Sequence, residues 1–139
     1  MTAIDPAQRL AERLDVEEAL LTNAFPNAKI DRPNGVVVLA DYGLPAGWTS
    51  TSTDVMFQIP ANYPAGCPDN VCVRPDLRLA NGEMPGNQSG VIHCADREWL
   101  QLSWHFVEQT DWVPTADASK GSNLVTYLLS AVTRFDEAS

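Results

Sequence analysis

The chain has 139 residues, which is enough for one domain with one hydrophobic core. Nine basic residues stand against eighteen acidic residues, for a formal net charge of -9. Such a surface repels phosphate backbones and anionic lipids, so the charge argues against nucleic acid and membranes as partners. No apolar run is long enough to span a bilayer and no signal peptide is recognisable, so we expect a cytoplasmic protein.

The cysteine content indicates reduced thiols rather than a disulfide framework. The count is odd, with Cys67, Cys72 and Cys94, and no Cys-x-x-Cys pair occurs. The two histidines lie far from any carboxylate-rich repeat, so we expect neither a metal site nor a cofactor. Cys72 lies between two valines and is expected in the core, whereas Cys67 belongs to a proline-rich turn and is expected to pack.

The chain opens with a predicted helix over residues 5–23. Asp5 can cap its N-terminus, and Pro6 suits its first turn. An apolar stripe runs along it, made of Leu10, Leu14, Val16, Leu20 and Leu21. The other side is either a solvated surface or a docking face for a partner, and it carries Arg9, Glu12, Arg13, Glu17 and Glu18.

Four short strands follow in the prediction. Residues 28–31 and 36–40 flank a Pro-Asn-Gly turn, which is a strong turn signal. Residues 54–59 alternate between apolar and other residues, as expected for a half-buried strand. Residues 71–73 form a short strand inside a segment that prolines punctuate.

The second half predicts a long loop between ordered segments. Residues 80–97 are rich in glycine, asparagine and serine, and a loop of that length in a small domain is often functional. Residues 99–104 look extended, and residues 123–135 form an amphipathic helix that Ser122 can cap. The elements therefore predict one α+β domain with a core over about residues 5–135, in which the helices cover one or both sides of an antiparallel meander.

The order of elements resembles the ubiquitin-conjugating (UBC) fold, which has an N-terminal helix, a four-stranded antiparallel meander, a long active-site loop and a C-terminal helix. Residues 57–60, Phe-Gln-Ile-Pro, followed by Tyr63-Pro64, are similar to the family's strand and proline turn. Residues 112–114, Trp-Val-Pro, are similar to the turn just after the family's catalytic cysteine.

A closer resemblance is to the prokaryotic UBC-like proteins of family E. Its motifs are Leu-Pro-x-Gly-Trp at residues 44–48, Tyr-Pro-x-x-x-Pro-Asp at residues 63–69, and Trp-x-x-x-Ser-x-His with Trp-x-Pro at residues 99–114. The similar region covers about residues 20–135. The resemblance implies a component of a bacterial ubiquitin-like modification pathway, with a ubiquitin-like protein and an activating enzyme as partners and antiphage defence as one setting.

Two departures from the UBC pattern bear on chemistry. The His-Pro-Asn motif, which helps to stabilise the oxyanion, is absent from its expected place near residues 78–80. The catalytic cysteine of the family is expected about eight residues before Trp112, where Ser103, Trp104 and His105 stand instead. The nearest cysteine in that direction is Cys94, in the predicted loop.

Three candidate catalytic residues follow from the resemblance. Cys94 is either the thiol that accepts the acyl group or an incidental loop thiol. Ser103 and His105 have the i, i+2 spacing that places two side chains on one face of a strand. Ser103 could form an oxyester, and His105 is either a general base, oriented by Glu108 or Asp111, or a packed histidine.

The aromatic residues near these candidates are expected as core or as cleft walls. Tyr63, Trp104 and Trp112 are the predicted binding residues for the C-terminal tail of the modifier. Two other functions stay open: a catalytically silent UBC-like module that binds the ubiquitin-like protein or its activating enzyme, and an unrelated α+β hydrolase or cyclase that uses Ser103 and His105.

Overall fold

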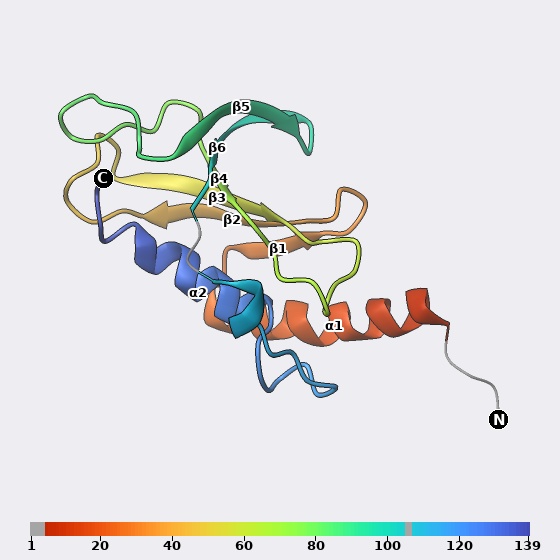
Figure 1. The fold of residues 1–139 in the computed structure, drawn as a ribbon. Helices are drawn as coiled ribbons and strands as arrows, with labels where there is room; N and C mark the ends of the chain where they lie inside the picture. The colour runs from red at the N-terminus through yellow and green to blue at the C-terminus, as the bar shows by residue number, and fades with distance from the viewer. Residues whose placement is uncertain (1–4, 105–106) are drawn as a thin grey trace.

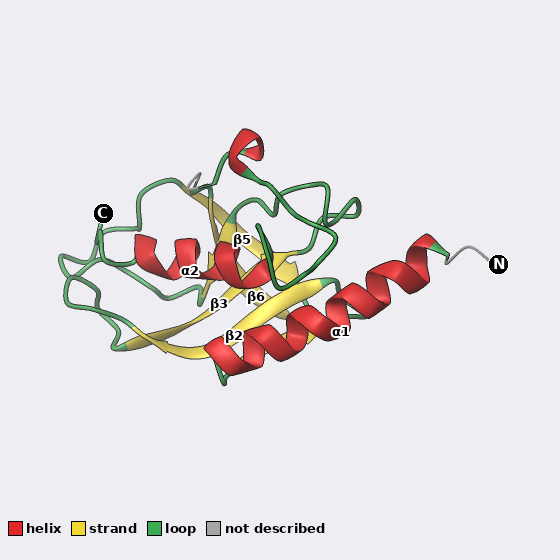
Figure 2. Ribbon diagram, turned by 90° about the horizontal axis from the view of Figure 1, so that it is seen from below, coloured by secondary structure: helices red, strands yellow, loops and turns green. Residues whose placement is uncertain are grey.

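The computed structural model describes residues 5–104 and 107–139. Within these residues, an antiparallel sheet of six strands is covered by two α-helices, α1 (Pro6–Ala24) and α2 (Leu124–Arg134). Figures 1 and 2 show both helices on the same face of the sheet. The predicted α+β class with a helix at each end is confirmed, and the architecture is consistent with a UBC-like fold.

The sheet extends the predicted meander by a hairpin. The first four strands lie side by side in chain order, namely β1 (Ala28–Asp31), β2 (Val36–Gly43), β3 (Ser52–Gln58) and β4 (Val71–Val73). The order is completed by β6 (Arg97–Leu102), which pairs with β4, and β5 (Gln88–Cys94), which pairs with β6. The sheet therefore has six strands where the resemblance implied four.

The predicted loop over residues 80–97 is wrong from Gln88 onward, because β5 forms there. In this edge strand Val91, which keeps 54% of its surface in solvent, lies on the exposed face, whereas Ile92 and Cys94 lie on a partly buried face. Because an apolar residue occupies the exposed face, the sequence shows no clear hydrophobic period here. A two-residue turn at Ala95 and Asp96, with φ of 50° and 64°, joins it to β6.

The main core lies between the sheet and the helices, and a smaller cluster lies on the opposite face. Val55 and Phe57 of β3 belong to the main core, whereas Met56 belongs to the smaller cluster with Cys72 and Trp99. The expectation of a half-buried strand at β3 is therefore wrong, since both of its faces are covered. The placement of Cys72 in the core is confirmed.

A network of ion pairs and hydrogen bonds links β3 to neighbouring segments on the face of the sheet that carries the smaller cluster. Asp54 of β3 accepts hydrogen bonds from Arg74 at 2.9 Å and Arg97 at 2.8 Å, and from the Asp41 backbone N–H at 2.9 Å. Burial alone would raise the pKa of Asp54, but these donors outweigh it and lower the pKa to about 2. The guanidinium of Arg97 also lies 4.0 Å above the Trp99 ring.

Helix α1 begins as predicted, with Asp5 accepting from the Ala7 N–H at 3.1 Å and Pro6 in the first turn. The predicted charged face is wrong at Glu17, which is completely buried. Glu17 lies three residues after Leu14 and four before Leu21, so it falls on the apolar stripe itself. Val16, by contrast, was assigned to the stripe and is 47% exposed.

Helix α2 begins one residue later than predicted and has a different cap. Asn123, not Ser122, is the N-cap, and it forms a capping box with Thr126. Ser122 serves the preceding chain instead: its hydroxyl accepts from the Val113 N–H at 2.9 Å, and its own N–H donates to the Val113 carbonyl at 2.9 Å. Two hydrogen bonds thus hold Val113 of the Trp-Val-Pro segment against the residue that precedes the N-cap of α2.

Candidate functional site

The proline turn lies directly against the segment that precedes α2. The indole N–H of Trp112 donates to the Pro64 carbonyl at 2.7 Å. The Gln109 side chain bridges the two segments, because it donates to the Ala65 carbonyl at 3.1 Å and accepts from the Cys67 N–H at 2.9 Å. Gln109 belongs to a short 3-10 helix, η1 (Gln109–Asp111). The two motifs that resemble the UBC frame therefore meet in space.

Cys67 is the thiol that the fold places beside this segment. Its sulfur lies 4.0 Å from the Val107 carbonyl and 3.1 Å from the Pro68 carbonyl, and the side chain is partly buried. Burial, followed by the charges of Asp69 and Glu108, raises the pKa of Cys67 to about 11. At neutral pH the group is therefore a protonated thiol and a weak nucleophile.

Cys94 is not on a loop, because it is the last residue of β5 and pairs with Arg97. It packs, half-buried, against the smaller apolar cluster on the face opposite the helices. Ser103 follows the other end of β6, six residues beyond Arg97, which corresponds to about 20 Å along a strand. The structure therefore does not bring Cys94 and Ser103 together.

Ser103 lies just outside β6, which ends at Leu102. Ser103 is half-buried, and its N–H donates to the Asn87 carbonyl at 2.8 Å. His105 lies outside the described residues. The predicted roles of these two residues remain predictions.

The three predicted binding aromatics are all buried in the protein's own core. Tyr63, Trp104 and Trp112 are 4%, 2% and 6% exposed. Each described indole N–H has a backbone acceptor: Trp48 donates to Phe135, Trp99 to Cys94, Trp104 to Gly86 and Trp112 to Pro64. Almost the whole of each side chain is therefore covered by the protein itself, and a role for these aromatics in binding a tail remains a prediction.

A groove of about 740 Å³ opens next to the proline turn. Its walls are α1, residues 63–65 and the loop of residues 114–118. Arg13 lines it with a side chain that is only 10% exposed, and its Nη2 has no hydrogen-bond partner among the described residues. The other Arg13 nitrogens are used, since Nε donates to Glu17 at 2.7 Å and Nη1 to the Thr115 carbonyl at 2.6 Å.

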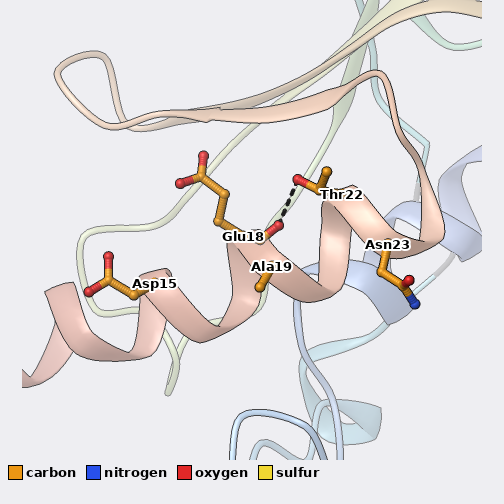
Figure 3. Close-up of a pocket in the computed structure, with 5 residues that line it drawn as sticks. All are labelled: Asp15, Glu18, Ala19, Thr22 and Asn23. Atoms are coloured by element: carbon orange, nitrogen blue, oxygen red, sulfur yellow. Dashed lines mark hydrogen bonds between the residues drawn. The ribbon is translucent and has the colours of Figure 1, made fainter.

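A second hollow lies along α1 and is lined by Asp15, Glu18, Ala19, Thr22 and Asn23 (Figure 3). Its carboxylates serve the fold, because Glu18 accepts from the Ile30 N–H of edge strand β1 at 3.1 Å. Arg32 also pairs with Asp15 at 2.7 Å. None of the predicted catalytic residues lines it.

Comparison with known families decides the relationship. The model of prokaryotic E2 family E matches residues 17–131, which is most of the chain. The chain belongs to this family. As a family E protein it is a UBC-like component of a ubiquitin-like pathway. No curated protein and no solved structure matched the chain.

Two further observations describe the family E protein. Its described residues contain no helix that is both long and apolar enough to cross a membrane. In the same ranges, no three histidine, cysteine, aspartate or glutamate side chains are grouped to hold a metal ion.

Two residues at the candidate site of this family E protein, Cys67 and Glu17, are not predicted from the sequence. Cys67 is predicted from the sequence as a packing residue of the turn, yet its sulfur lies 4.0 Å from the carbonyl of Val107, three residues after Trp104 in the chain. The pairing of β4 with β6, with Val71 opposite Leu102, produces this proximity. Glu17 joins the turn through the Tyr63 hydroxyl at 2.7 Å. The position of Glu17 on the apolar stripe of α1 is the feature of the sequence from which its burial could have been predicted.

Proposed function

We propose that this protein receives or presents the C-terminus of a ubiquitin-like modifier on the surface formed by the proline turn and residues 107–112. The observation that carries the proposal is the closure of the turn on Trp112 and Gln109 by three hydrogen bonds. This contact joins the two family motifs that frame an acyl-accepting site. Membership of family E supports a role in a ubiquitin-like pathway. The contact between the two motifs supports this surface as the place where the modifier's C-terminus binds.

The thiols favour a catalytically silent form of this role. Burial raises the pKa of Cys67 to about 11 and that of Cys72 to about 12, so neither supplies a thiolate at neutral pH. Cys94 packs on the opposite face of the sheet from the helices, away from the turn. We therefore propose binding without a thioester as the leading form. Carriage of the acyl group on Ser103 or His105 is the competing form.

The groove beside α1 is our candidate for docking of the activating enzyme. Its lining is largely apolar, with Leu10 and Val16 from the helix and Pro64 and Ala65 from the proline turn, which is the kind of surface that a partner protein covers. We expect Val16→Asp to weaken this binding at least tenfold without unfolding the protein, since Val16 is 47% exposed. Leu129→Asp is the matched control, because Leu129 is 49% exposed on α2 and lies outside the groove. Equal weakening by both variants would remove the groove from the proposal.

One assay separates the forms of the proposed function. The protein is incubated with its activating enzyme, modifier and ATP, and non-reducing gels are run with and without thiol or alkali. Binding of modifier or activating enzyme with no adduct supports the silent form. An alkali-labile, thiol-resistant adduct that is lost in Ser103→Ala supports an oxyester, and a thiol-sensitive adduct lost in Cys67→Ser or Cys94→Ser contradicts the silent form. Neither binding nor adduct would refute the proposal as a whole.

A further inference from the structure

Glu17 is a buried carboxylate at the meeting point of three elements. It is 0% exposed, although it lies in the middle of α1 among charged residues. Burying an ionised carboxylate is strongly unfavourable unless hydrogen bonds and an opposite charge compensate it. Its surroundings must therefore be built around it.

Three donors from three parts of the chain converge on this carboxylate. Arg13 Nε, one turn earlier on α1, donates at 2.7 Å. The Tyr63 hydroxyl, at the start of the proline turn, lies 2.7 and 2.8 Å from the two oxygens. The backbone N–H of Leu124, the first residue of α2, donates at 2.7 Å. The negative charge thus also complements the N-terminus of α2.

Two arms lead from Glu17 to the same turn of the candidate site. Through Tyr63 it holds the proline turn, whose Pro64 carbonyl accepts from Trp112. Through Leu124 it holds the start of α2, where Ser122 binds the Val113 backbone on both its N–H and its carbonyl. The two hydrogen-bonded paths therefore end at the neighbouring residues Trp112 and Val113, and both begin at Glu17.

We propose that Glu17 is the positioning residue of the candidate site. Its carboxylate sets the place of the Trp112-Val113-Pro114 turn and holds the proline turn on the segment that precedes it. Its relevance to a modifier rests on the proposed function, whereas its control of the turn does not. A buried ion pair adds little net stability compared with apolar packing, and a role in fixing one arrangement accounts for a charge at this position.

Cys67 provides a local probe of this arrangement, because its sulfur lies against the Val107 carbonyl across the contact that Glu17 controls. In a Cys72→Ala/Cys94→Ala background, the alkylation rate of Cys67 in native buffer reports opening of the proline turn. Glu17→Gln keeps the size of the side chain but removes its charge, and we expect it to raise this rate about tenfold or more. Tyr63→Phe, which removes one arm alone, should raise it by a smaller factor and guards against a Glu17 variant that fails to fold.

Asp54→Asn is the matched control, because Asp54 holds another ion network on the opposite face of the sheet. Urea unfolding measures the global stability of every variant. The proposal requires that Asp54→Asn change the rate of Cys67 labelling less than twofold, even when it lowers the global stability as much as Glu17→Gln does. This is expected because different regions of a protein can open locally and independently of one another. Labelling that follows global stability in both variants, or that stays unchanged in Glu17→Gln, overturns it.

Binding of the modifier is measured in parallel on the same proteins. Weaker binding by Glu17→Gln, with binding by Asp54→Asn retained, supports positioning at a working site. If the wild-type protein binds no modifier, the proposed function fails while the labelling result still decides the role of Glu17. The two failures are therefore distinguishable.

Discussion

We expect Cys67 to react slowly at neutral pH, unlike the thiol of an acyl carrier. Its pKa of about 11, against a reference value of 9.0, lowers the thiolate fraction about 100-fold. The thiolate that does form is about tenfold more nucleophilic, since intrinsic reactivity rises with thiol pKa. The two effects leave Cys67 about tenfold slower than an ordinary cysteine, before its partial burial slows it further.

The assay is a pH profile of alkylation in the Cys72→Ala/Cys94→Ala background, with a small reagent in excess and a cysteine peptide as reference. The rate should rise about tenfold per pH unit without a plateau below about pH 10. Asp69→Asn removes one of the charges that raise the Cys67 pKa, so its profile should bend at lower pH and its rate at pH 7.5 should increase. Asp76→Asn, at an exposed position, is the control for a change of net charge.

A plateau below pH 9, or a rate at pH 7.5 above that of the peptide, would refute the reasoning. Either result would mean that the fold stabilises the thiolate of Cys67. The electrostatic case against a thioester at this position would then be lost, and Cys67 would become the leading candidate for the acyl acceptor.

The other predictions concern the frame of the site. Asp54 has a folded pKa of about 2, below its unfolded value, so its stabilisation is complete above about pH 4 and lost as the pH falls toward 2. Asp54→Asn should lower the unfolding free energy by about 1–2 kcal/mol at pH 7 and by much less at pH 2 in urea titrations, and an equal loss at both would contradict this. Gly121→Ala should cost about 2 kcal/mol or more, because φ is +68° and the new Cβ would lie 2.5 Å from the Val113 carbonyl. Gly82→Ala, with φ of +87° and open space around it, should cost clearly less in the same thermal melts. Trp104→Phe should cost about 1–3 kcal/mol, measured by urea unfolding, since it removes the hydrogen bond to Gly86.

Local signals made much of the fold predictable. Asp5 and Pro6 mark the start of α1 because a cap and a first-turn proline act through their own backbone. The β-branched run of β2 and the amphipathic period of α2 identify their elements in the same way. The family motifs could be placed on loops for the same reason, since prolines and tryptophans punctuate the chain around residues 63–69 and 112–114.

Long-range contacts account for what the sequence did not predict. The edge strand β5 owes its existence to pairing with β6 and shows no period of its own. The burial of Glu17 depends on donors from Tyr63 and Leu124, which lie far along the chain. The position of Cys67 beside Val107 follows from the pairing of β4 with β6. In each case the surroundings of the residue or strand depend on a segment that is distant in the chain, so the local sequence does not predict them.

The charges around the turn argue against acyl transfer more generally than the thiol pKa does. Acyl transfer develops a negative oxygen, which an active site stabilises with donors or positive charge. Here Asp69 and Glu108 act on Cys67 beside the segment where the acceptor is expected, and the His-Pro-Asn motif is absent. Two carboxylates that raise a thiol pKa disfavour a tetrahedral oxyanion at the same place for the same reason. The frame of a conjugating site is therefore combined with an electrostatic environment that disfavours the transfer step, and this combination is the physical basis for preferring the silent form in our proposal.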